Sequence, residues 1–106
     1  MSLLFNLPFN LERNVFYMND LNADELFETI GRNVKYYRKL YNLNKGKMTQ
    51  ENLAELVDVS TALIGNLESD KIHQGISVPT LWKICKVLEI SVEDLFNPST
   101  AEKEVM

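Results

Sequence analysis

The hydrophobic positions of the chain predict a series of short amphipathic helices. From Leu26 to Tyr41, apolar side chains recur every three or four positions, which is the spacing of one face of a helix. Asn22, with Glu25 three positions later, predicts a capping box at the start of this helix. Residues 42–48 interrupt the apolar period, so we expect a loop there.

Two further helices are predicted close together in the middle of the chain. Thr49 and Ser60 are good N-cap residues, and they begin runs with helical spacing over residues 49–57 and 60–69. A turn of about three residues, 58–60, connects these two runs. Because so short a turn does not suit an antiparallel reversal, we expect the two helices to cross sharply.

The last third of the chain predicts two more helices. Ser77 caps the first, with Pro79 in its first turn, where a missing amide is tolerated. Ser91 caps the second, which Pro98 ends. No segment shows a convincing strand pattern, so we predict an all-α fold of five helices. The residues expected to face the core in the second, third and fourth helices are Leu53, Ala54, Leu56, Val57, Leu63, Ile64, Leu67, Leu81, Ile84, Cys85, Val87 and Leu88.

The two ends of the chain differ from this pattern. Residues 1–21 are apolar but irregular, and Pro8 interrupts them. They form either an arm that packs on the domain or on a second chain, or a flexible terminus. Residues 98–106 are expected to be a C-terminal tail that is frayed from Ser99 onward. The helical domain is therefore placed at residues 22–97.

The charge of the chain is unevenly distributed. The 106 residues include 11 Lys and Arg against 15 Asp and Glu, and the net charge of −4 argues against a general nucleic-acid binder. Residues 26–48, however, carry six basic residues and one acidic residue, for a local charge of +5. Local fields matter more for binding than the total, so the overall charge does not exclude an anionic partner.

Several kinds of protein are not expected from this composition. Cys85 is the only cysteine and His73 the only histidine, which excludes an intrachain disulfide and the usual zinc ligand sets. We see no nucleophile–base constellation and no phosphate-binding glycine loop, so we expect no enzyme, cofactor, metal or small-molecule ligand. The apolar runs are too short to span a bilayer, and we see no signal peptide, which favours a cytoplasmic protein without a membrane partner.

The order of the motifs along the chain is more informative than any one of them. Residues 49–68 open with Thr-Gln, contain Leu-Ala and a Val-Ser turn, and close with Ile-x-x-Leu-Glu. Ile30, Gly31 and Arg38 precede this stretch, and two further motifs follow it at residues 77–81 and 87–96. Over about residues 26–97 the chain resembles the Cro/C1-type, or Xre, helix-turn-helix family. The resemblance implies a lambda-repressor-like DNA-binding domain of five helices with an N-terminal extension.

The resemblance also implies which residues touch DNA. Thr61, Ala62 and Asn66 stand where the family reads bases. An Asn amide can pair with adenine, and Thr or Ala can contact a thymine methyl. Phosphate contacts are expected from Gln50, Ser60 and Lys71. The alternative is a small, polar, solvated face without readout, since residues 60–69 contain no Lys or Arg.

Two further residues are implied to have a structural role. In the family, an Arg of the first helix and the Glu that closes the recognition helix form an ion pair. Arg38 and Glu68 occupy these positions. A partly buried pair of this kind mainly specifies how two helices are arranged.

The sequence thus predicts a transcriptional regulator, repressor-like, that binds a pseudo-palindromic operator as a homodimer. One module buries limited surface, so two half-sites about one helical turn apart are the usual route to affinity. The candidate dimer contacts are the last helices (Trp82, Ile90, Val92, Phe96) or the arm (Phe5, Leu7, Phe9, Phe16, Tyr17). The alternative is an antitoxin-like or anti-repressor-like protein-interaction module that lost DNA binding, which the acidic total and base-poor recognition helix favour.

Overall fold

A computed structural model describes residues 22–101 of the chain, and these residues contain helices and no strand. The helices are α2 (Ala23–Asn44), α3 (Gln50–Val57), α4 (Thr61–Glu68), α5 (Val78–Leu88), α6 (Val92–Phe96) and α7 (Pro98–Ala101). The prediction of an all-α fold is confirmed. The arm at residues 1–21, and residues 102–106 of the tail, lie outside the described range.

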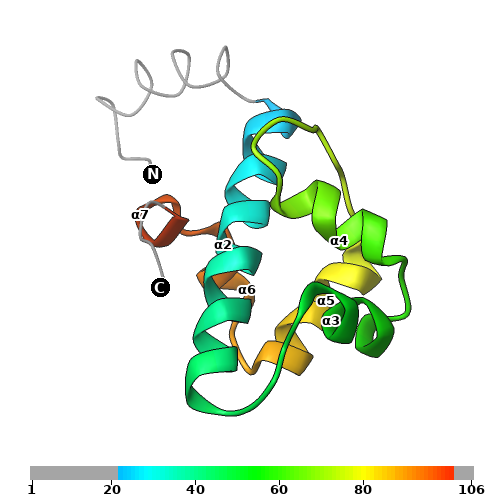
Figure 1. The fold of residues 1–106 in the computed structure, drawn as a ribbon. Helices are drawn as coiled ribbons and strands as arrows, with labels where there is room; N and C mark the ends of the chain where they lie inside the picture. The colour runs from blue at the N-terminus through cyan, green and yellow to red at the C-terminus, as the bar shows by residue number, and fades with distance from the viewer. Residues whose placement is uncertain (1–21, 102–106) are drawn as a thin grey trace.

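The other helices are arranged around the long helix α2. Helices α3 and α4 lie on one side of α2, and α7 lies on the other (Figure 1). Both α5 and α6 also pack against α2, and α5 packs against α3. No helix within residues 22–101 is at once long enough and apolar enough to cross a membrane.

Local capping explains where the four shorter helices α3 to α6 begin. The side chains of Thr49, Ser60, Ser77 and Ser91 each accept a hydrogen bond from the amide three residues later. These residues supply partners for amides that have none inside the helix. The predicted starting points of all four helices are therefore confirmed.

The start of α2 differs from the prediction of a capping box. The Asn22 side chain accepts from the amide of Asp24, two residues on, at 2.8 Å, and the structure describes no return bond from Glu25. Reciprocal boxes occur instead at Thr49, where Asn52 returns the bond, and at Ser91. The short Asn22 side chain reaches the second amide of the helix, a geometry that needs no reciprocal partner.

Two helices end at residues with a left-handed backbone. Asp58 (φ 63°) ends α3 as predicted, and Glu89 (φ 61°) ends α5. Asp tolerates this conformation better than most residues because its short side chain can bond locally. At the other boundary the prediction was too short, since α2 continues to Asn44 instead of ending before residue 42.

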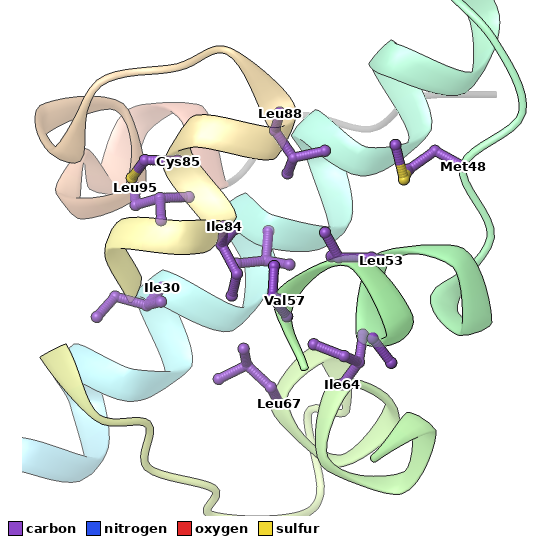
Figure 2. Packing of buried hydrophobic residues seen from close by; sticks show 12 residues of the cluster. Ile30, Met48, Leu53, Val57, Ile64, Leu67, Ile84, Cys85, Leu88 and Leu95 are labelled. Atoms are coloured by element: carbon purple, nitrogen blue, oxygen red, sulfur yellow. The ribbon is translucent and has the colours of Figure 1, made fainter. Parts of the chain in front are cut away.

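The core lies between α2, the α3–α4 pair and α5 (Figure 2). Its buried members are Ile30, Val34, Met48, Leu53, Ala54, Val57, Ile64, Leu67, Ile84, Cys85, Leu88 and Leu95. Leu56 is the main error of the predicted core, because 59% of it is exposed. Leu53 and Val57 fix the inward face of α3, and Leu56 falls to one side of it, roughly 60° from Leu53 and roughly 100° from Val57.

The C-terminal helices are fastened to α2 by a buried amide. Asn33 has no exposed surface, and its side chain donates to the carbonyl oxygens of Leu95 at 2.6 Å and Asn97 at 3.1 Å. Pro98 ends α6 as predicted, but it also begins α7, which packs against α2. The prediction of a frayed tail is therefore wrong for the first residues after Pro98. Proline suits this position because the first helical amide needs no partner.

Candidate nucleic-acid interface

The turn between α3 and α4 is as short as predicted. Asp58 ends α3 and Ser60 caps α4, so one residue, Val59, separates the two caps. The amide of Val59 donates to the carbonyl of Ala54 at 3.0 Å, which closes the end of α3. The pair is thereby held as one compact helix-turn-helix unit.

A buried ion pair fixes this unit to α2. The Arg38 guanidinium donates to both carboxylate oxygens of Glu68, at 2.8 and 2.9 Å, and to the carbonyl of Met48 at 3.1 Å. Arg38 and Glu68 are 9% and 5% exposed. The structure thus brings together the two residues for which the resemblance implied an ion pair. The two parallel bonds set the direction as well as the distance between the helices.

Gln50 joins the same network. Its side-chain amide donates to Glu68 at 2.9 Å, and the residue is half-buried at the start of α3. An amide nitrogen carries two hydrogens, so one remains for another acceptor after the bond to Glu68. The ion pair therefore holds the predicted phosphate-contacting side chain in a defined position.

Gly31 allows α2 and α4 to approach closely. A Cβ atom at Gly31 would lie 1.8 Å from the carbonyl oxygen of Leu67, far inside van der Waals contact. The neighbouring atoms belong to the backbone of α4 and cannot rotate away. Glycine is thus required at position 31 of α2, where the helix faces Leu67, the residue that precedes Glu68. The sequence singled out Gly31 only through the family resemblance.

The outward face of α4 carries the residues predicted to read bases. Ile64, Leu67 and Glu68 are buried. Thr61 and Ala62 are exposed, whereas Asn66 is half-buried, with its amide nitrogen 3.5 Å from the Gln74 side-chain oxygen. The first turn is thus open to solvent, and Asn66 is held beside the loop that follows.

Ser60 is exposed at the cap of α4. Its hydroxyl oxygen accepts from the amide of Leu63 at 3.0 Å, which leaves the hydroxyl hydrogen to donate elsewhere. The remaining amides of the first turn point out of the helix end, where an anion is favoured. The arrangement can bind a phosphate oxygen at this end of α4.

The loop at residues 69–77 presents Lys71 and is held against α2. Lys71 is exposed, and its backbone amide donates to the Ser69 hydroxyl at 3.1 Å. Asp70 pairs with Arg32 at 3.4 Å, and His73 lies 3.2 Å from Asp24. Arg32 is one of the six basic residues in the stretch 26–48, and the Asp70 carboxylate partly neutralises it.

Cys85 lies in the core, in surroundings that keep its thiol unreactive. Burial raises the pKa of its thiol, and the nearby Asp94 carboxylate raises it further. The thiol therefore stays protonated at neutral pH, whereas the thiolate is the reactive form. This environment agrees with the interpretation of Cys85 as a core residue.

Comparison with family models identifies the unit. A model described as Helix-turn-helix (HTH_3), of the Cro/C1 type, matches residues 34–95. Comparisons with curated proteins and with solved structures gave no match. The matched range includes α3, α4 and α5, the second half of α2 and most of α6, and it spans more than half of the 106 residues. The chain therefore belongs to the Cro/C1-type helix-turn-helix family, whose model supports a DNA-binding regulator.

Proposed function

We propose that the chain regulates transcription by binding a specific double-stranded DNA sequence, with α4 in the major groove. The observation that carries this proposal is the contrast across α4. Its inner side is fixed by the buried pair of Glu68 and Arg38, while Thr61 and Ala62 are exposed on its first turn. A major groove about 12 Å wide admits a helix presented in this way. Small side chains would let the backbone of α4 come close to the bases.

Base reading is assigned to Thr61, Ala62 and Asn66. Asn66 can pair with both hydrogen-bonding atoms of an adenine edge, and Thr61 and Ala62 can contact thymine methyl groups. The hydrogen bond from Asn66 to Gln74 is long, at 3.5 Å, and therefore weak. Replacing it with a contact to a base costs little free energy.

Phosphate contacts are assigned to Gln50, Ser60 and Lys71. These residues start α3, cap α4 and follow α4, so they can contact the backbone on either side of the reading helix. Gln50 and Ser60 donate a neutral hydrogen bond each, and Lys71 adds a positive charge. Because few cations take part, we expect a shallower salt dependence than that of a strongly basic domain.

We further propose that the protein acts as a homodimer on a pseudo-palindromic operator, where occupancy gives a repressor-like effect. A single module of this size makes a small interface, and a second half-site about 34 Å away multiplies the affinity. Trp82 on α5 supports such a dimer because 56% of it is exposed. Exposed tryptophan is a common anchor of protein interfaces.

The test is selection from random duplex DNA with the purified protein at low salt, followed by binding at increasing salt. The expected result is one enriched motif with two related half-sites. Lys71→Ala should weaken binding to all sequences alike, whereas Asn66→Ala should relax selectivity at one base pair. If the selection enriches no site, the regulator proposal fails.

A protein-interaction module is the second candidate function. It is favoured by the net charge of −4 and by α4, which contains no Lys or Arg. In that case the exposed face of α4 would contact a protein, and the purified chain would bind random and selected duplexes equally weakly. The same selection experiment therefore separates the two candidates.

A further inference from the structure

Helix α2 has an apolar side that faces away from the proposed DNA interface. Gly31 and Arg38 point toward α4, and Asn33 points toward α6. At about 100° per residue, Tyr36, Leu40 and Leu43 fall on the far side of α2 from α4. Tyr36 and Leu40 are half-buried, and Leu43 is 61% exposed.

Helix α6 extends this apolar side. Leu95 of α6 points into the core, and Asp94 falls about 100° to one side of it around the helix. Val92 and Phe96 are four residues apart and lie on the opposite flank of α6, where they are 43% and 42% exposed. Asn33 of α2 donates to the carbonyl oxygens of Leu95 and Asn97, on either side of Phe96 in the chain, and so holds this end of α6 against α2.

The five residues of this surface, which we call the α2–α6 face, are Tyr36, Leu40, Leu43, Val92 and Phe96. Exposed apolar residues that gather on one side of a small protein mark a candidate interaction site. Five side chains are few beside the 20 to 30 residues per partner of a standard interface between separate proteins. A tethered segment needs less area, because the tether supplies a high effective concentration.

The segment at residues 1–21 has the composition and the reach to be this occupant. Ten of the sixteen residues from 3 to 18 are large and apolar: Leu3, Leu4, Phe5, Leu7, Phe9, Leu11, Val15, Phe16, Tyr17 and Met18. It joins α2 at Asn22, and Tyr36 lies about 21 Å further along the helix at 1.5 Å per residue. A chain of 21 residues can extend to about 70 Å.

Charge agrees with this assignment. Lys39 is half-buried next to the stripe that holds Tyr36 and Leu43 on α2. The segment carries two acidic residues, Glu12 and Asp20, against one basic residue, Arg13. The exposed apolar surface of α5 around Trp82 is less suited, because the ammonium of Lys86 already lies over the Trp82 ring at 5.5 Å.

We propose that residues 1–21 fold back and cover the α2–α6 face of their own chain. The segment would then lie on the side of α2 opposite α4, where α7 also packs. It would leave α3, α4 and the Trp82 surface of α5 free for DNA and for a second copy. The proposal does not depend on DNA binding.

The experiment measures amide hydrogen exchange of residues 1–21 in the full chain. It compares Leu43→Lys/Val92→Lys with Leu43→Lys/Val78→Lys. Val78 and Val92 are a matched pair, since each is exposed and is the first residue of a helix after a serine cap. We expect the unmodified segment to exchange at least about tenfold more slowly than an unfolded chain. The Val92 double variant should lose this protection to within about twofold, and the Val78 double variant should lose less.

Two further measurements complete the test. The amides of Ile84 and Leu88 in α5 report whether each variant is folded. If a double variant does not fold, the single variant Leu43→Lys is measured in its place. Light scattering gives the mass at each concentration. Free exchange of residues 1–21 in the unmodified chain overturns the proposal, as does equal loss of protection in both double variants. Protection that disappears on dilution, together with a fall from two chains to one, also overturns it, because the segment would then cover a second copy.

Discussion

The two sides of α4 differ in how strongly other residues of the chain fix them. The inner side has a bidentate ion pair between Arg38 and Glu68, a hydrogen bond from Gln50, and a contact with Gly31 that leaves no room for a methyl group. The outer side has the exposed residues Thr61 and Ala62, whose side chains make no hydrogen bond or ion pair with residues 22–101. The inner side can change little without loss of the fold, while the outer side is free to vary, as the proposed reading of DNA by α4 requires.

The largest expected effect is that of Glu68→Ala on the inner side. It leaves the Arg38 guanidinium buried without a counter-ion, which destabilises by about 3–5 kcal/mol. Urea unfolding should show this loss, and DNA binding should fall with it. Glu55→Ala, at an exposed residue of α3, is the control and should change the free energy of unfolding by less than about 0.5 kcal/mol. Loss of binding with unchanged stability would contradict the structural role of Glu68.

The next largest effect is that of Gly31→Ala. The new Cβ would lie 1.8 Å from the Leu67 carbonyl oxygen, so α2 and α4 must separate, at a cost of about 3 kcal/mol. Gly46→Ala is the matched control, since a Cβ there meets nothing within 4 Å. If both variants unfold at the same urea concentration, the close approach of the two helices is wrong.

The sequence predicted the parts of the fold that depend on local interactions. The caps at Thr49, Ser60, Ser77 and Ser91 involve residues three positions apart, and each predicted helix start is confirmed. The left-handed end of α3 at Asp58 is local in the same sense. The family match, over residues 34–95, explains why the order of the motifs was more informative than the net charge.

The sequence could not predict features that depend on contacts between distant segments. Asn33 is fully buried and binds carbonyls more than sixty positions away, yet it interrupts the apolar pattern of its helix in the way a surface residue would. The pairing of Arg32 with Asp70 and the packing of α7 on α2 are of the same kind. Leu56 is the opposite case, an apolar residue that is exposed although its spacing fits the buried face. Helical spacing alone cannot decide where the edge of a buried face lies.

On the outer side of α4, Asn66→Ala should separate binding from stability. Asn66 has one long hydrogen bond, so its loss should change the free energy of unfolding by less than about 0.5 kcal/mol. If Asn66 reads an adenine, discrimination at that base pair should fall by about 1–3 kcal/mol, measured by competition between matched and substituted duplexes. Asn44→Ala, at the exposed end of α2, is the control. Unchanged selectivity would remove Asn66 from the reading face.

Gly65→Ala has the smallest expected effect on stability and DNA binding. It is also the sharpest test of the comparison between the two sides of α4. Within the chain a Cβ at Gly65 would lie 3.5 Å from the Gln50 side-chain oxygen, an ordinary contact, so the fold does not require glycine there. Alanine should therefore raise stability by up to about 1 kcal/mol through helix propensity. If the backbone of α4 lies against DNA, the same methyl group should weaken binding, so the two measurements move in opposite directions. A variant that is more stable and binds DNA as well as the unmodified chain would show that Gly65 does not approach the groove.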